Sequence, residues 1–98
     1  MSDWTFSTNG ARDFVDVYAY GFEIFGKAVA DDYAESLRKC FTRLAMNPRM
    51  GRLAESAGAA VRRLEHRRHV VFYEIEPVGA GVRIIAIVHE RSIRKFEG

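Results

Sequence analysis

A chain of 98 residues has room for one domain and no second core, so residues 1–98 are expected to form a single domain. Hydrophobic residues make up 48% and charged residues 29%, as in globular proteins, and no apolar stretch approaches the roughly 20 residues of a membrane span. The start of the sequence lacks the basic and apolar runs of a secretory signal, and the single Cys40 can form no internal disulfide. We therefore expect a cytoplasmic protein without membrane attachment.

The first quarter of the chain predicts a short strand and a helix. Residues 4–7 alternate apolar and polar side chains, as in a half-buried strand. The helix is expected to be capped by Thr8 or Asn9, with Asp13 near its first turn, where a negative charge complements the helix dipole. One face of the helix is marked at three- and four-residue steps by Phe14, Val17, Tyr18, Gly21 and Phe25. Gly26 is expected to end it.

A second helix follows directly and is expected to end at Asn47-Pro48. Two helices joined at one glycine must fold back as an antiparallel hairpin. The second helix has the cleaner apolar face, formed by Ala30, Tyr33, Ala34, Leu37, Phe41 and Leu44. The first helix has additional apolar residues away from its main face, namely Val15, Tyr20, Phe22 and Ile24. Either both sides of the first helix are buried, or one side forms an exposed groove for a partner helix.

The second half of the chain predicts a loop and three strands. Residues 49–59 show no firm period, whereas residues 60–65, 69–76 and 82–89 are rich in β-branched and aromatic residues. Turn residues at 66–68 and 77–81 separate the strands, and the last two strands should form an antiparallel hairpin. The sequence therefore predicts an α+β fold, in the order β-α-α-β-β-β, with the first strand at an edge or beside the last strand.

Positive charge is concentrated in the second half. Residues 1–48 contain five Lys or Arg and seven Asp or Glu, whereas residues 49–98 contain ten and six. Six arginines fall within one stretch of 20 residues: Arg49, Arg52, Arg62, Arg63, Arg67 and Arg68. Arginine suits bidentate contact with carboxylate or phosphate, so this stretch is either a solvated face or a docking surface for an anionic partner.

No motif for a cofactor, a metal or nucleophilic catalysis is present. Gly79-Ala80-Gly81 opens no helix, as a phosphate-binding loop would, and the three histidines lack cysteine partners and an HExxH arrangement. A metal-free ribonuclease is harder to exclude, since it needs only an acid, a base and cations, roles open to His89, Glu90, Arg91, Tyr73 and Arg62. Strand alternation places His89 on the face of Ile85 and Ile87, which favours a packed, hydrogen-bonded core residue.

Several segments follow one another in a characteristic order: Gly26 with Ala30, Tyr33 and Leu37, then residues 44–52 with Asn-Pro-x-x-Gly, Val61-Arg62-Arg63, His69-Val-Val-Phe-Tyr73, and a last strand from Ile84 ending in His89-x-Arg91. Together they resemble the ParE branch of the ParE/RelE toxin superfamily, over about residues 7–91. Departures lie at the last strand, where Ala86 replaces a frequent arginine and Ser92-Ile93 replaces methionine-aspartate.

The resemblance implies two antiparallel helices packed on a small twisted antiparallel sheet, and a toxin of a type II toxin–antitoxin system. ParE-like members poison DNA gyrase, whereas RelE-like members cleave mRNA on the ribosome, using lysine, arginine and C-terminal tyrosine or histidine. No tyrosine follows Tyr73 and no histidine follows His89, which argues against the nuclease branch. We therefore expect a gyrase poison that acts by binding, without catalytic residues or a cofactor. The alternatives are a RelE-like mRNA endoribonuclease and a degenerate, non-toxic binding module.

The resemblance also implies a hetero-oligomer with a ParD-like antitoxin. Candidate antitoxin-binding residues lie along the first helix: Phe14, Tyr18, Phe22 and Phe25. Candidate contacts with the gyrase target are Arg62, Arg63 and Arg91, although salt bridges to glutamates of the sheet would explain the same arginines. We expect no direct sequence-specific binding of nucleic acid.

Overall fold

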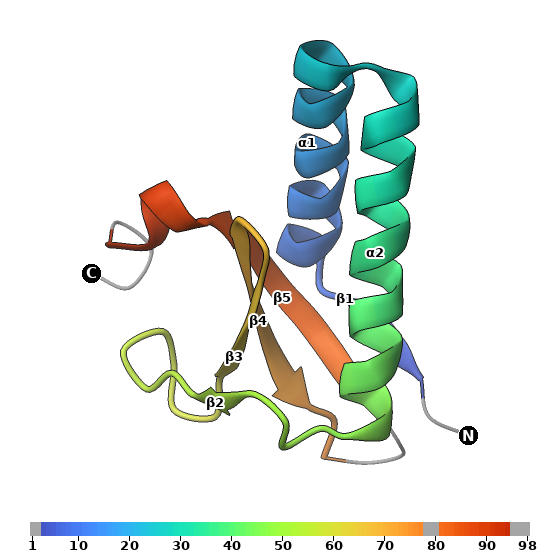
Figure 1. The fold of residues 1–98 in the computed structure, drawn as a ribbon. Coiled ribbons are helices and arrows are strands. Elements are labelled where there is room, and N and C mark those ends of the chain that lie inside the picture. The colour runs from blue at the N-terminus through green and yellow to red at the C-terminus, as the bar shows by residue number, and fades with distance from the viewer. Residues whose placement is uncertain (1–2, 78–80, 95–98) are drawn as a thin grey trace.

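In the computed structural model, which describes residues 3–77 and 81–94, a helical hairpin stands against one face of a sheet and extends past its end (Figure 1). The elements in chain order are β1 (Trp4–Phe6), α1 (Thr8–Phe25), α2 (Lys27–Met46), β2 (Arg52–Leu53), β3 (Arg62–His66), β4 (His69–Ile75), β5 (Val82–His89) and a 3-10 turn (Glu90–Ser92). The predicted order β-α-α-β-β-β is confirmed, with β2 as one further short strand in the segment predicted as a loop. The predicted turn at 77–81 lies partly outside the described residues, at 78–80.

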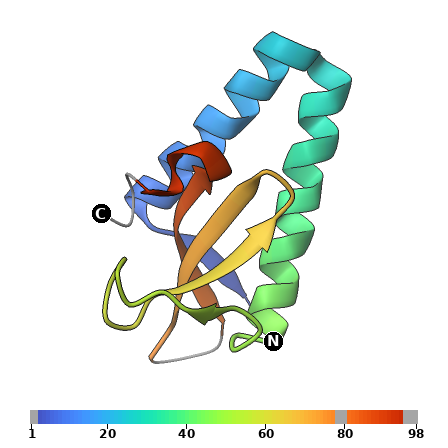
Figure 2. The ribbon, with the colours of Figure 1, turned by 60° about the vertical axis from the view of Figure 1, so that its left-hand side comes forward.

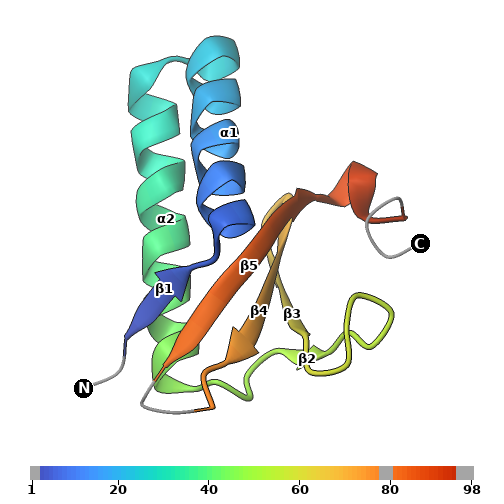
Figure 3. The ribbon, with the colours of Figure 1, turned by 180° about the vertical axis from the view of Figure 1, so that it is seen from behind.

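The five strands form a mixed sheet in the order β1-β5-β4-β3-β2. β1 lies at the edge beside β5, as predicted, but the two run parallel, with Trp4 opposite Val82 and Phe6 opposite Ile84, so the sheet is not antiparallel throughout. The reason is the helical hairpin, which returns the chain to the end of the sheet where β1 began (Figures 1 and 3). β3 and β5 then run in the direction of β1, while β4 runs against it.

A β-bulge interrupts the pairing of β4 with β5. Phe72 lies opposite Ala86 while Tyr73 lies opposite Ile84, so Ile85 is an extra residue on β5. Ile84 and Ile87 therefore both face the helices, whereas Ile85 packs on the opposite face of the sheet. Simple alternation, which placed Ile85 and His89 on one face, fails at this bulge.

Each face of the sheet has its own apolar cluster. On the helix side, α2 contributes the fully buried Leu37, Phe41 and Leu44, which pack against the sheet residues Val71 and Ile84. On the other side, Val70, Phe72 and Ala86 are covered by the segment between β2 and β3, which turns away from the helices (Figures 2 and 3). Among the described residues no helix is long and apolar enough to cross a membrane.

The backbone of Ser7 and polar side chains at the start of α1 bind the edge of β5, at and beyond the last residue of β5 that pairs with β1. The backbone N–H of Ser7 donates to Ile84 O (3.0 Å), and Asn9 Nδ2 donates to Ile85 O (3.2 Å). Asp13 Oδ2 accepts a hydrogen bond from the N–H of Ile87 (2.9 Å). These bonds replace a neighbouring strand along this part of the β5 edge.

This docking also corrects the predicted start of α1. Ser7, rather than Thr8 or Asn9, is the N-cap, since its extended backbone lies against β5 and its Oγ accepts from Gly10 N (2.9 Å). Asp13 is bound to the sheet rather than placed in the first turn, and its burial raises the pKa of its carboxyl group. Gly26, with a φ of 92°, ends α1 as predicted, and Asn47 ends α2.

Gly10 is expected to be required for this docking, because a Cβ added there would lie 2.1 Å from Ile84 O. Replacing a mid-helix glycine by alanine ordinarily stabilises a helix by about 1 kcal/mol. We expect Gly10→Ala instead to destabilise the fold by about 1–3 kcal/mol, because the backbone of β5 cannot move aside. Urea unfolding monitored by circular dichroism measures this change.

Gly21→Ala provides the control within the same helix. A Cβ at Gly21 would meet Ala30 Cβ at 3.7 Å, an ordinary contact, so this variant should be as stable as the parent or more stable. Equal effects of the two substitutions would contradict the assigned role of Gly10.

Candidate functional site

The end of the hairpin that projects past the sheet exposes many apolar side chains. Their exposed fractions range from 48% to 63%, in Val15, Tyr20, Phe22, Ile24, Phe25 and Val29. The additional apolar surface of α1 is therefore exposed, and the alternative in which both of its sides are buried is wrong for these residues. Six large apolar side chains exposed within residues 15–29 indicate an interaction site.

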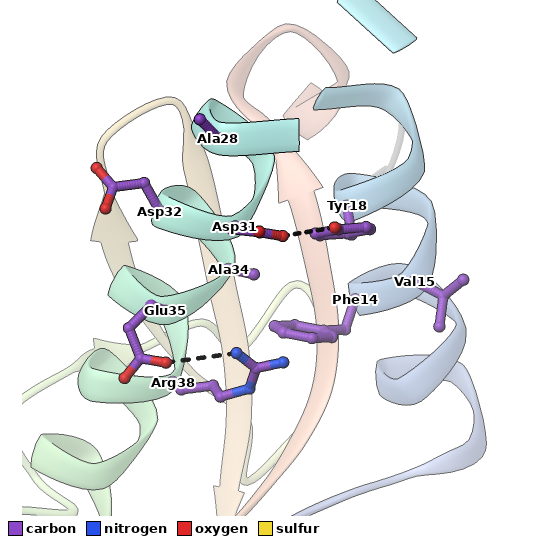
Figure 4. A pocket seen from close by; sticks show the side chains of 9 residues that line it. All are labelled: Phe14, Val15, Tyr18, Ala28, Asp31, Asp32, Ala34, Glu35 and Arg38. Atoms are coloured by element: carbon purple, nitrogen blue, oxygen red, sulfur yellow. Dashed lines mark hydrogen bonds and ion pairs between the residues drawn. The ribbon is translucent and has the colours of Figure 1, made fainter. Parts of the chain in front are cut away.

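A groove of about 750 Å³ lies between α1 and α2, and we call it the hairpin groove (Figure 4). Phe14, Val15 and Tyr18 of α1 form one side, and the α2 side consists of Ala28, Asp31, Asp32, Ala34, Glu35 and Arg38. The groove thus combines an aromatic wall with a largely acidic wall.

Hydrogen bonds and ion pairs hold the two walls of the hairpin groove together. Tyr18 Oη donates to Asp31 Oδ1 (2.6 Å), which raises the pKa of Tyr18, and Lys27 Nζ lies 2.6 Å from Asp31 Oδ2. The bonds from Lys27 and Tyr18 lower the pKa of Asp31. Arg38 pairs with Glu35 (3.5 Å) and lies over the ring of Phe14, 5.2 Å from its centroid. Asp32 makes no ion pair within the described part of the chain and is free to bind a cation.

A second hollow, of about 490 Å³, lies where the projecting hairpin meets the end of the sheet, and we call it the basic recess. The hairpin contributes its apolar and aromatic wall: Val17, Tyr20, Phe25, Val29 and Tyr33. The β3–β4 turn and the end of β5 contribute its polar wall: Arg67, Arg68, His69, His89 and Arg91. The antiparallel register places His69 opposite His89, which brings these two distant segments together.

Tyr33 connects the two walls of the basic recess. Its Oη lies 2.6 Å from His69 Nδ1, and the guanidinium of Arg67 lies over its ring at 5.6 Å. Arg67 adopts a positive φ of 53° in the tight β3–β4 turn. Nearby, Ser36 Oγ donates its one proton to Tyr33 O (2.7 Å), so it accepts from His66 Nε2 (3.0 Å).

Three arginines supply the permanent positive charge of the basic recess. Burial, together with the adjacent His89 and His66, lowers the pKa of His69 to about 4, so this side chain is neutral at pH 7. Burial likewise lowers the pKa of His66. Arg67 and Arg91 form no ion pair within residues 3–77 and 81–94, and Arg68 lies 3.9 Å from Glu90.

The structure separates the three arginines predicted to contact a target. Arg91 lines the basic recess. Arg62 instead donates to Gly51 O (2.7 Å), and Arg63 binds Glu65 (2.9 Å) and lies over the ring of Phe72. The arginines that accompany Arg91 are Arg67 and Arg68, which were predicted to lie in a turn of the arginine-rich stretch but were not among the residues predicted to contact a target. The antiparallel strand pairing was the signal that could have identified them.

The four aromatic residues predicted to bind an antitoxin are also divided. Phe14 and Tyr18 line the hairpin groove, and Phe22 lies beside Tyr18 with ring centroids 6.1 Å apart. Phe25 lines the basic recess instead. The aromatic residues predicted to bind an antitoxin are therefore divided between the hairpin groove and the basic recess, both of which are lined by the helical hairpin.

The side chains considered for ribonuclease chemistry do not form one site. Tyr73 is fully buried, its Oη donating to Pro48 O (2.6 Å) and accepting from Gly51 N (2.9 Å). Tyr73 of β4 is paired with Arg62 of β3 on one side and with Ile84 of β5 on the other, whereas His89 lies five residues further along β5. His89 is half-buried and packs edge-on against His69, and its Nδ1 accepts from Arg91 N (3.1 Å). Among the described residues no three His, Cys, Asp or Glu side chains are placed to hold a metal ion.

Three comparisons relate this chain to known proteins. Residues 5–94 match a family model described as the ParE toxin of the type II toxin–antitoxin system parDE. The toxin ParE1 of Mycobacterium tuberculosis, in strains CDC 1551 and H37Rv, is 25% identical over 76 residues, which is 78% of this chain and 76% of the relative. A solved chain of the chromosomal ParDE system from P. aeruginosa shares the fold, with a TM-score of 0.72 and 19% identity over 91% of this chain and 96% of that chain.

The low pKa of His69 predicts how stability depends on pH. An unfolded chain protonates this histidine near its ordinary value of 6.5, whereas the folded chain does so near 4. Between these values the unfolded state binds more protons, so the free energy of unfolding should fall as the pH is lowered from 6.5 to 4.

His69→Gln should reduce this decline, because glutamine can still bond Tyr33 but takes up no proton. Urea unfolding of both proteins at intervals from pH 4 to pH 8 measures the difference. Part of the decline should persist through His66, whose pKa is also lowered. An unchanged pH profile in the variant would contradict the neutral state assigned to His69.

Proposed function

Because the chain belongs to the ParE toxin family, we propose that it inhibits growth by binding and poisoning DNA gyrase, and that a ParD-like antitoxin neutralises it. The observation that carries this proposal is the exposed apolar end of the hairpin next to the basic recess. An apolar surface flanked by exposed arginines suits a protein that binds other proteins.

The hairpin end is the proposed contact surface for the antitoxin. Phe14, Tyr18 and Phe22 offer aromatic side chains along one line of α1, spaced as an amphipathic partner helix requires. Phe25 extends the same surface into the basic recess. The acidic wall of the hairpin groove, with Asp32 unpaired among the described residues, favours a partner helix that carries a cation at that point.

The basic recess is the proposed contact for gyrase. Arg91, predicted from the sequence, is exposed there together with Arg67 and Arg68. Arg62 and Arg63 remain candidates, although each already binds a group of its own fold. We propose that poisoning occurs by binding without bond making, because the side chains considered for ribonuclease chemistry do not form one site: Tyr73 is buried and Arg62 binds Gly51 O.

A supercoiling and DNA-cleavage assay with purified gyrase tests the target. The wild-type protein should inhibit supercoiling, and Arg67→Ala combined with Arg91→Ala should weaken inhibition about tenfold or more, because two exposed cations are lost. Arg49→Ala is the matched control, since Arg49 is exposed and lies outside the recess. Unaffected gyrase together with cleaved mRNA would show the RelE-like activity instead.

Co-expression with a ParD-like antitoxin tests the partner. Val15→Ser with Phe22→Ser should leave stability nearly unchanged, because both side chains are exposed, but should weaken antitoxin binding and rescue from growth arrest. Met46→Ser is the control, since Met46 is 67% exposed at the opposite end of α2. Growth that is normal with the toxin alone would identify a non-toxic binding module.

A further inference from the structure

The basic recess combines an apolar wall with arginines, and no carboxylate lines it among residues 3–77 and 81–94. We propose that it receives an extended acidic segment of the antitoxin, with one large apolar side chain inside and flanking carboxylates on Arg67, Arg68 and Arg91. This assignment rests on the proposed function, because it specifies how the neutralising partner engages the toxin. It also defines a second contact, separate from the hairpin groove.

The apolar wall supplies the reason for a large apolar side chain. Tyr20, Phe25 and Val29 are each at least 50% exposed, so the isolated chain leaves them in contact with water. A volume of about 490 Å³ accommodates a Leu, Phe or Trp side chain without displacing the hairpin. Phe25 and Val29 line the recess and also belong to the exposed hairpin end, so a partner bound at that end is adjacent to the recess.

The arginines supply the reason for carboxylates. Arg67 is oriented by stacking on Tyr33, and neither Arg67 nor Arg91 has an ion-pair partner in the described part of the chain. Arg68 has only the 3.9 Å contact with Glu90. An exposed guanidinium beside an apolar wall can bind a carboxylate in a bidentate manner.

The surroundings of the recess favour a peptide over nucleic acid. The adjoining hollow is lined by Asp13 and Asp16, and Glu90 lies next to Arg68. The hairpin lines the same recess as the arginines, so a duplex that approached them would meet either the hairpin side chains or these carboxylates. A patch of three arginines bounded by acidic residues can bind one or two carboxylates of a single extended peptide.

The arginine charge of the recess does not change with pH near neutrality. The titratable groups around the recess are His69, His89, Tyr20 and Tyr33, with His66 and Glu90 just outside it. The low pKa of His69 leaves this side chain neutral at pH 7, so it adds no charge to that of the arginines.

The test measures affinity for the ParD-like antitoxin that neutralises the wild-type toxin. Arg67→Glu with Arg91→Glu should weaken binding about 100-fold and reduce its dependence on salt, because two attractions become repulsions. Arg49→Glu makes a comparable charge reversal outside the recess and should change affinity less than about threefold. Circular dichroism and urea unfolding verify that each variant is folded.

A charge reversal in the antitoxin tests whether its carboxylates contact these arginines directly. Changing the partnering Asp or Glu of the antitoxin to Lys should restore most of the affinity for the doubly reversed toxin. Equal affinity of the wild-type and doubly reversed toxins for the antitoxin would overturn the inference while leaving the proposed function intact. Failure of any ParD-like protein to bind the wild-type toxin, with no growth arrest, would instead overturn the proposed function.

A titration of the isotope-labelled wild-type protein tests the recess without the antitoxin. Acetyl-Glu-Leu-Glu-amide should shift the NMR signals of His69, Tyr33 and Arg67 at lower concentration than acetyl-Gln-Leu-Gln-amide does. A 12-nucleotide single-stranded DNA should cause smaller shifts there. Equal responses to the two peptides, or stronger binding of the oligonucleotide, would contradict an acidic-peptide site.

Discussion

The contact between the first turns of α1 and the open edge of β5 determines the arrangement of the rest of the molecule. β1 pairs with β5 only as far as Ile84, and beyond that point side chains of α1 take over the hydrogen bonds of the edge. Gly10 permits the necessary approach, since any side chain there would meet the backbone of β5. Because the start of α1 is fixed at this edge, the length of the helix carries its far end past the sheet.

This projection produces both proposed binding surfaces. The hairpin end has no sheet beneath it, so its aromatic and aliphatic side chains remain exposed, and the angle between hairpin and sheet becomes the basic recess. The hairpin groove is largely acidic and the recess is basic, so the two surfaces select different charges in a partner. In the proposed function an antitoxin that occupies the recess would also cover the arginines proposed to contact gyrase. The antitoxin would then neutralise the toxin by blocking its contact with gyrase.

The hydrophobic periodicity predicted much of the fold and less of the candidate site. Both helices, the break at Gly26 and the last three strands followed from local patterns, because each is formed from residues close in sequence. The bulge at Ile85 did not follow, and it changed which side chains of β5 face the helices. Arg62 and Arg63 were singled out as a pair with Arg91, but the structure places them at β3, where they bind Gly51 O and Glu65, away from the recess that Arg91 lines.

Local patterns in the sequence were sufficient to predict the helical hairpin, the order of the main strands along the chain, the excess of arginine in the second half and the resemblance to the ParE toxins. These properties depend on composition, periodicity and motif order, which require no knowledge of distant contacts. The grouping of Arg91 with Arg67, Arg68 and Tyr33, and the exposure of the far end of α1, became visible in the folded structure. Those outcomes depend on the register of β4 with β5, which the bulge shifts, and on where α1 meets the sheet edge, which is set by contacts such as that of Asp13 with Ile87, 74 positions apart.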